Sequence, residues 1–295
     1  MKKEKLLVST VAGDATETAV AFGLGLEVAE YCTAYNLDVH RAKTDAQVFS
    51  EIRTVSAAGG AGRTVRPGAE AREEGAEKNA AGEGKKQVAA SAARVVAPVG
   101  WVFHAPFNEL FPCAIDPEAA ALARRRYEEA AACALSYGIS GMVVHAGYLK
   151  HVYYKEWFIE QSAAFWRDFL KDKPASFRLY AENVFEDDPA LLPALADAVG
   201  DARFRLCLDI GHANCVSQAG VLAFLEQAGG RIGHFHLHDN PGDGDRHGAL
   251  GEGNIPLAAL LTRAAALCPD ASYTLEALTA RPSAEWLCKN GFLEE

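Results

Sequence analysis

The sequence has no long hydrophobic run. Hydrophobic residues make up 49% of the 295 residues, yet no apolar stretch approaches the ~20 residues that a membrane-spanning helix needs. The chain begins MKKEK, and the partly apolar residues that follow are too few for the core of a secretory signal. We therefore expect a soluble, cytoplasmic protein.

Paired cysteine motifs are also lacking. The seven cysteines are an odd number, no two of them form a Cys-x-x-Cys motif, and none lies near a His-x-x-x-His pattern. This argues against a zinc finger and against a dithiol redox site. Most of the cysteines lie in apolar stretches such as Leu206-Cys207-Leu208, which favours buried thiols in a reducing compartment.

Positive charge is scarce. Lys and Arg total 29 against 39 Asp and Glu, so the net charge is −10. Proteins that bind duplex DNA neutralise its phosphates with basic side chains, so duplex DNA is not an expected substrate. The first apolar run is not followed by Gly-x-Gly-x-x-Gly, which argues against a dinucleotide-binding fold.

Short apolar runs alternate with longer helical patterns along the chain. We predict strands at Leu6–Ser9, Gly25–Tyr31, Val99–His104, Met142–His145, Phe177–Glu182, Arg205–Asp209, Ile232–His236 and Tyr273–Glu276. Helices are predicted near residues 117–137, 155–171, 189–199, 218–228 and 256–267. Such alternation indicates a parallel sheet, which is either closed as a (β/α)8 barrel (a TIM barrel) or open and doubly wound.

Residues 55–94 differ in composition from the rest of the chain. Of these 40 residues, 12 are alanine and 7 are glycine, and large apolar side chains are almost absent. Such a segment contributes little to a core. Since a barrel domain typically has about 250 residues, we interpret residues 1–295 as one TIM-barrel domain. The segment is then a flexible insertion between the second helix and the third strand.

Side chains able to bind a metal stand at the ends of the later predicted strands and in the loops that follow. They are His104, His145, Glu182, Asp209, His212, His236, Asp245, His247 and Glu276. The carboxyl ends of all strands of a barrel lie on one face, so these nine side chains would point into one cavity on that face.

Three of these nine side chains are strand-end carboxylates, those of Glu182, Asp209 and Glu276. Converging carboxylates repel one another and are costly to remove from water. A divalent cation relieves this cost. The accompanying histidines suit zinc, manganese or iron better than magnesium or calcium, so the residues predict a divalent-metal site.

Three stretches, LCLDIGHAN, FHLHDN and DRHGALGEGNIP, resemble the xylose isomerase-like TIM-barrel superfamily, the AP endonuclease 2 group. The resemblance covers roughly residues 99–280. The group includes endonuclease IV together with sugar isomerases and epimerases. In endonuclease IV nine ligands hold three zinc ions, and the nine residues named above match all nine positions.

The resemblance implies up to three metal ions per chain. The implied ligand sets are His104, His145 and Glu182; Glu182, Asp209, His236 and Glu276; and His212, Asp245 and His247. The full set supports metal-assisted hydrolysis of a phosphoester. The isomerases and epimerases use only the second set, and their counterparts of Glu182 and Glu276 carry a proton on and off a sugar carbon.

The number of ligands favours hydrolysis. Our leading hypothesis is a zinc-dependent, phosphodiesterase-like hydrolase of a small phosphorylated or nucleotide-like metabolite, with Glu182 and Glu276 as catalytic residues. The alternative is a sugar or sugar-phosphate isomerase or epimerase with one metal. A third class is a barrel that binds metal or ligand without catalysis, and the sequence does not indicate an oligomeric state.

Three further residues are candidate substrate contacts, each with a structural alternative. Tyr148 could line the pocket or pack a helix on the barrel. Glu27 could contact substrate or pair with a lysine. His238 could reach the substrate, orient a ligand imidazole or form a simple loop hydrogen bond.

Overall fold

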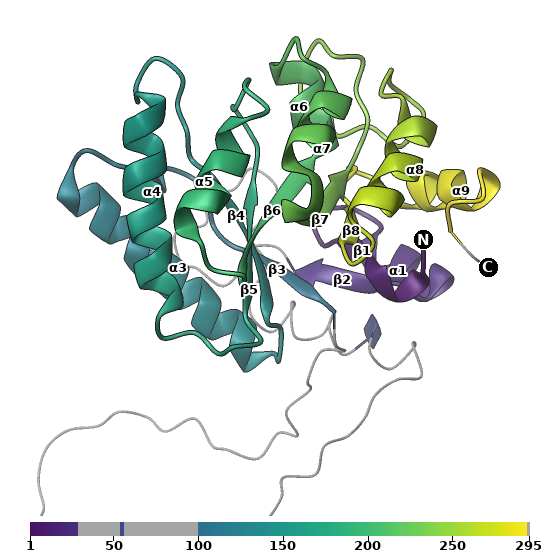
Figure 1. The fold of residues 1–295 in the computed structure, drawn as a ribbon. Helices are drawn as coiled ribbons and strands as arrows, with labels where there is room; N and C mark the ends of the chain where they lie inside the picture. The colour runs from purple at the N-terminus through teal and green to yellow at the C-terminus, as the bar shows by residue number, and fades with distance from the viewer. Residues whose placement is uncertain (29–53, 56–99, 294–295) are drawn as a thin grey trace, which may run out of the picture.

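The computed structural model describes residues 1–28, 54–55 and 100–293. Eight parallel strands close into a barrel, in which each strand pairs with the next and β8 pairs with β1 (Figure 1). The strands are β1 (Leu6–Ser9), β2 (Gly25–Val28), β3 (Val102–His104), β4 (Gly141–His145), β5 (Arg178–Glu182), β6 (Phe204–Asp209), β7 (Ile232–Leu237) and β8 (Ser272–Leu275). The predicted TIM barrel is therefore confirmed.

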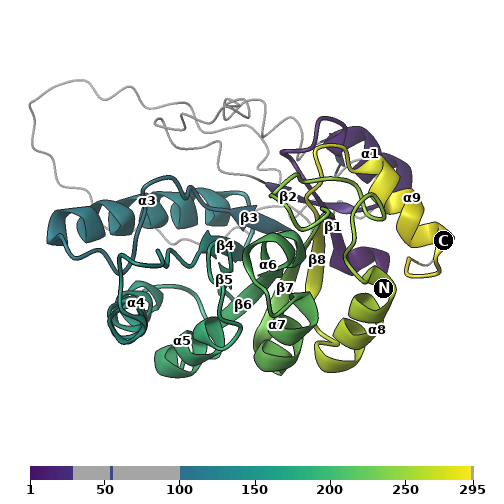
Figure 2. The same ribbon diagram turned by 90° about the horizontal axis from the view of Figure 1, so that it is seen from above.

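Helices surround the barrel. They are α1 (Ala15–Phe22), α3 (Pro117–Ser136), α4 (Lys155–Leu170), α5 (Leu191–Val199), α6 (Ile210–Val216), α7 (Val221–Ala228), α8 (Leu257–Leu267) and α9 (Arg281–Lys289). Helices α4, α5, α7 and α8 follow one another around the outside of the strands (Figure 2). Within the described residues, no helix has the length and apolar character needed to cross a membrane.

The predicted insertion lies outside the described residues, apart from Val55, which is buried. The last three residues of the second predicted strand also lie outside the described residues, as does residue 99, the first residue of the third predicted strand. Elsewhere the strand bounds agree with the predictions to within one or two residues.

Helix α3 begins and ends as its sequence predicts. The side chain of Asp116 accepts a hydrogen bond from the Glu118 amide at 2.7 Å, and Pro117 occupies the first turn. Beyond the helix, Gly138 has a φ of 79°, a left-handed conformation that costs glycine little. The Ile139 amide then donates back to the carbonyl of Ala134 at 3.0 Å, which closes the end of the helix.

The predicted helices did not include α1 and α9, and two elements at the carboxyl end of the barrel also differ from the prediction. Helix α5 begins at Leu191 rather than at Pro189, because the side chain of Asp188 accepts from the Ala190 amide and forms a turn before the helix. Helix α6 was not predicted, since its seven residues are too short for a helical pattern. It exists because Asp209 at the end of β6 caps it by accepting from the His212 amide at 2.7 Å.

Large buried aromatic side chains pack the helices against the barrel. Tyr127 of α3 and Trp166 of α4 lie 5.1 Å apart between ring centroids, and both are fully buried. Burial of a large apolar side chain contributes about 1.5–3 kcal/mol. This packing gives the strands a rigid frame, which fixes the positions of the side chains at their carboxyl ends.

Candidate metal centre

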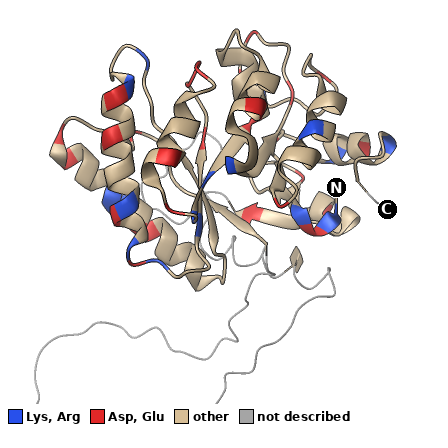
Figure 3. Ribbon diagram, viewed as in Figure 1, with Lys and Arg blue, Asp and Glu red and all other residues tan. Residues whose placement is uncertain are grey.

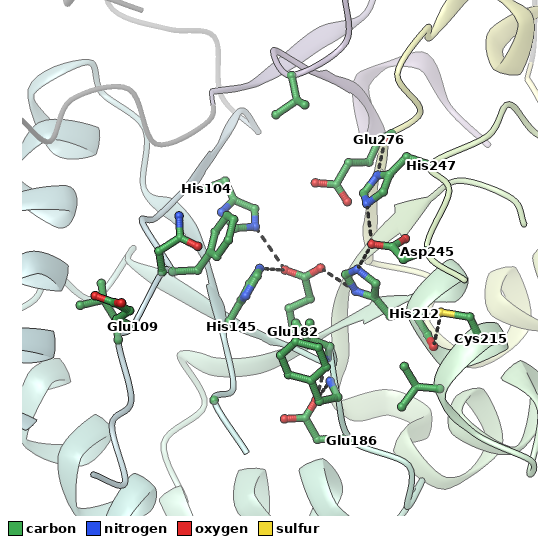
Figure 4. Close-up of a pocket in the computed structure, with 18 of the residues that line it drawn as sticks. His104, Glu109, His145, Glu182, Glu186, His212, Cys215, Asp245, His247 and Glu276 are labelled. Carbon is green, nitrogen blue, oxygen red and sulfur yellow. Dashed lines mark hydrogen bonds and ion pairs between the residues drawn. The ribbon is translucent and has the colours of Figure 1, made fainter. Parts of the chain in front are cut away.

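A cavity of about 450 Å³ opens at the carboxyl ends of the strands. Seven of the nine predicted metal ligands line it: His104, His145, Glu182, His212, Asp245, His247 and Glu276 (Figure 4). The other two, Asp209 and His236, are fully buried beneath it. The structure therefore brings all nine predicted residues together, although they come from the ends of six strands, a helix and a loop.

Glu182 at the end of β5 lies at the centre of this arrangement. Its Oε2 is 3.2 Å from His104 Nε2 and 3.4 Å from His145 Nε2, and its Oε1 is 3.0 Å from His236 Nδ1. The side chain is 1% exposed. Burial alone would raise the pKa of Glu182, but the surrounding histidines, His236 first, hold it well below its ordinary value. This carboxylate is ionised at neutral pH.

The floor of the cavity is formed by a group of four residues that we call the floor group: Glu182, Asp209, His236 and Glu276. One potential ligand atom from each lies within 4.8 Å of the others. His236 Nδ1 faces Glu276 Oε2 at 3.0 Å and Asp209 Oδ2 at 3.7 Å. The approach of His236 Nδ1 to Glu276 Oε2 does not have hydrogen-bond geometry, so this buried oxygen has no hydrogen-bond partner among the described residues. The floor group thus holds an unsatisfied oxygen where a cation would be bound.

A second group, which we call the rim group, contains His212, His238, Asp245 and His247. Asp245 Oδ2 is 3.3 Å from His212 Nε2 and 3.1 Å from His247 Nε2. Burial would raise the pKa of Asp245, but the two histidines lower it strongly. The imidazoles of His238 and His247 are stacked, with 4.0 Å between their centroids.

Donor chemistry shows that a divalent metal fits both groups. The floor group offers three carboxylates and one imidazole, and the rim group offers one carboxylate and three imidazoles. Such mixed nitrogen and oxygen sets suit zinc, manganese or iron. His104, His145 and Glu182 form a third cluster with the same character. The assignment of individual metal ions to these clusters stays a prediction.

His104 and His145 lie on either side of Glu182 and differ in charge. Burial would lower the pKa of His104, but the hydrogen bond to Glu182 raises it to about 9. Burial lowers the pKa of His145 to about 3, because neighbouring histidines oppose the effect of Glu182. His145 is thus neutral at pH 7 and has a free nitrogen lone pair, as metal binding requires.

Backbone carbonyls orient three of the histidines. The Nδ1 atoms of His104, His212 and His247 lie 2.8, 3.0 and 2.8 Å from carbonyl oxygens of Ala105, Asn183 and Glu276 respectively. Each Nδ1–H donates to its carbonyl, which leaves Nε2 directed into the cluster. The side chain of Asn183 also donates to the Asp209 carbonyl and accepts from the Asp209 amide, both at 2.9 Å.

None of the three predicted substrate contacts lines the cavity. Tyr148 is 5% exposed and packs on Phe158, which agrees with its structural alternative. Glu27 is fully buried inside the barrel and pairs with histidines rather than with a lysine. His238 donates to Asp209 at 3.0 Å below the cavity. All three side chains are at most 5% exposed. Their burial depends on neighbours distant in sequence, so the residue type at or near a strand end did not reveal which layer each would occupy.

Sequence reasoning missed several residues that line the cavity. They are apolar side chains of the loops after β3 and β5, such as Phe107, Phe111 and Phe185, together with Glu186. The aromatic residues directly after His104, in the string APFNELF, were the available signal. Glu186 carried no signal, because its importance comes from complete burial.

The fold and the site together define a class: a TIM barrel with histidine and carboxylate clusters at its carboxyl end that could hold divalent metal ions. Residues 80–289 match the family described as xylose isomerase-like TIM barrel. This match covers well over half of the sequence, so the chain belongs to that family.

One curated relative is the uncharacterized protein MJ1311 of Methanocaldococcus jannaschii. It is 25% identical over 185 residues, which are 59% of this chain and 63% of that protein. The matched part thus spans less than two thirds of the relative's length.

Solved structures support the same fold. A D-tagatose 3-epimerase-like protein is 25% identical with a TM-score of 0.57, covering 64% of this chain and 76% of that one. The TTHB071 protein from Thermus thermophilus, soaked with ZnCl2, is 22% identical with a TM-score of 0.64 and 97% coverage of both chains. An L-ribulose 3-epimerase is 16% identical with a TM-score of 0.62, covering 98% of this chain and 86% of that one.

Proposed function

We propose that the protein is a divalent-metal-dependent isomerase or epimerase that acts on a ketose sugar. The observation that carries this proposal is the arrangement of Glu182 and Glu276. Both carboxylates line the cavity, and each comes within 3.0 Å of His236 Nδ1. The likeness to a D-tagatose 3-epimerase-like protein and to an L-ribulose 3-epimerase favours this function over our leading sequence-based hypothesis of hydrolysis.

The reaction needs a proton to leave and return to a carbon next to a carbonyl. A divalent cation held by the floor group would polarise that carbonyl and make the neighbouring C–H bond more acidic. Glu182, which its histidine neighbours keep ionised, is suited to accept the proton. Glu276, which follows β8 three strands around the barrel from β5, would return a proton. In epimerisation the proton goes to the other face of the same carbon, and in isomerisation it goes to the former carbonyl carbon.

Charge at the cavity wall indicates the substrate class. Among the described residues that line the cavity, none is Lys or Arg. In Figure 3, Lys and Arg positions are coloured along outer helices such as α3, α4 and α9. A phosphate group is usually bound by cationic side chains or helix N-termini. We therefore favour an unphosphorylated ketose, whose C–H faces would pack on Phe107 and Phe111.

A proton-exchange experiment tests this proposal. The protein, loaded with Mn²⁺ or Zn²⁺, is incubated with unphosphorylated ketoses in D2O, and carbon-bound deuterium is measured by NMR. We expect deuterium next to the carbonyl and a new epimer or aldose. Glu182→Gln should reduce exchange by at least ~100-fold because the base is lost. The exposed Glu285→Gln is the matched control and should leave exchange unchanged. Absence of exchange with every ketose would contradict the proposal.

Phosphoester hydrolysis is the second candidate, and the rim group is the observation that favours it. An isomerase with a single metal does not need His212, Asp245 and His247 around a second cation. In the hydrolytic alternative, these residues would hold an additional ion near the substrate. About three metal ions per chain by elemental analysis, together with turnover of bis(p-nitrophenyl) phosphate that His247→Ala abolishes, would favour hydrolysis over isomerisation.

A further inference from the structure

His236 is oriented differently from His104, His212 and His247. His104, His212 and His247 direct Nδ1 to a backbone carbonyl and Nε2 into the clusters. His236 is reversed, because its Nδ1 faces Glu182 and Glu276 in the floor group. Its Nε2 points down into the barrel, away from the cavity.

Glu27 of β2 meets His236 Nε2 inside the barrel. The Nε2 atom lies 3.1 Å from Glu27 Oε1 and 3.3 Å from Glu27 Oε2, and both side chains are 0% exposed. Among the described residues, no Lys or Arg pairs with this carboxylate: its other contacts are Thr274 Oγ1 at 2.7 Å and His234 Nε2 at 3.0 Å. A buried carboxylate is costly, so its position directly behind a predicted ligand calls for a functional reason.

We propose that Glu27 is a positioning residue for metal binding by His236. Glu27 accepts the Nε2–H of His236, which fixes the tautomer whose Nδ1 lone pair faces the floor group and holds the ring plane in place. His234 and Thr274 hold the Glu27 carboxylate in turn. His234 is itself anchored, since its Nδ1 lies 2.7 Å from Ser272 Oγ. The inference rests on metal binding by the floor group, but it does not depend on which reaction the site catalyses.

Zinc affinity of folded protein is the first measurement. Titration with a competing chelator gives the dissociation constant for wild type, Glu27→Ala, Glu27→Gln and the exposed control Glu285→Gln. Loss of a carboxylate behind a ligand histidine typically weakens metal binding about 10–100-fold, which we expect for Glu27→Ala. Glu27→Gln should weaken it less, because the amide oxygen still accepts the Nε2–H. Glu285→Gln removes an exposed carboxylate outside this network and should change affinity less than about twofold.

The second measurement reports the protonation of the His236 imidazole and needs no substrate. In zinc-loaded wild type, ¹⁵N NMR should show a protonated Nε2 on His236 whose proton exchanges slowly with water. In Glu27→Gln this signal should shift, and its exchange should be faster. The Gln variant keeps the side-chain volume, so it serves if Glu27→Ala does not fold.

A purely structural role for Glu27 predicts other results. Stability would then fall in both Glu27 variants, while zinc affinity per folded molecule and the His236 signal would match those of wild type. That outcome would overturn this inference and leave the proposed function standing. A wild-type protein that binds no divalent metal would overturn both.

Discussion

At the scale of single residues, the site concentrates negative charge where water is nearly absent. Glu27, Glu182 and Asp209 are at most 1% exposed, and each is matched with imidazoles at hydrogen-bond distance. Pairing with imidazoles offsets part of the cost of removing these carboxylates from water. The site still has several carboxylates close together and few cationic groups beside them. The remaining charge is what a divalent metal would balance.

Glu186 should make the stability of the folded protein depend on pH, and it is not one of the predicted metal ligands. Complete burial raises its pKa to about 7 from the ordinary 4.5, although the amides of Val184, Tyr148 and Phe185 favour the ionised form. The folded protein thus keeps a proton that the unfolded chain releases near pH 4.5. Its stabilising effect is fully present below that pH and is lost as the pH rises to 7.

We expect this loss in denaturant unfolding of wild type between pH 5 and pH 8. A pKa difference from 4.5 to about 7 corresponds to at most about 3 kcal/mol. Glu186→Gln cannot titrate, so its free energy of unfolding should fall less over the same range, while exposed Glu285→Gln should follow wild type. Parallel pH profiles for wild type and Glu186→Gln would show that Glu186 titrates normally.

At the scale of elements, the short helix α6 and the loop after β7 pack closely against each other. Asp209 ends β6, caps α6 and accepts a hydrogen bond from His238. Gly211 in the first turn of α6 leaves room for the His238 imidazole, because a Cβ at this position would overlap that ring. The glycine of the LCLDIGHAN string is therefore required by packing rather than by backbone conformation.

Gly211→Ala should therefore disturb both the fold and the metal site. Overpacking a tight interior costs typically about 1–3 kcal/mol, and displacement of His238 would free Asp209 from its partner. We expect lower stability in urea unfolding and a weaker zinc affinity. Gly230→Ala is the control, because a Cβ there meets no atom within 4 Å. Equal zinc affinities for the two variants would contradict the role assigned to Gly211.

At the scale of the whole molecule, the fold could be predicted because its signals are local. Each strand is a short apolar run, and alternation with helices indicates a parallel sheet. The choice of a closed barrel over an open sheet came from the chain length and from the family resemblance. The order of the strands then brings their carboxyl ends to one face, which is why the nine candidate metal ligands could be expected to converge. Helix α6 was missed because its stability comes from one capping side chain and from burial.

The depth and direction of side chains could not be predicted in the same way. Glu27 and Glu276 both stand at or near strand ends, yet Glu27 lies inside the barrel and Glu276 lines the cavity. Which layer a side chain occupies depends on strand register and on neighbours distant in sequence. The reversed ring of His236 likewise depends on Glu27, 209 residues away.

Metal removal should affect the stability of the whole barrel, because the floor group joins β5, β6, β7 and the end of β8. A ligand that binds only the folded state stabilises it by about 2.7 kcal/mol at a concentration 100 times its dissociation constant. For a chain of this size this corresponds to a rise in Tm of roughly 5–10 °C. We expect such a rise on adding Zn²⁺ or Mn²⁺ to chelator-treated protein, measured by calorimetry. Glu182→Gln should remove most of it, since Glu182 belongs to two of the clusters. An equal rise in Glu182→Gln would place the bound metal elsewhere on the protein.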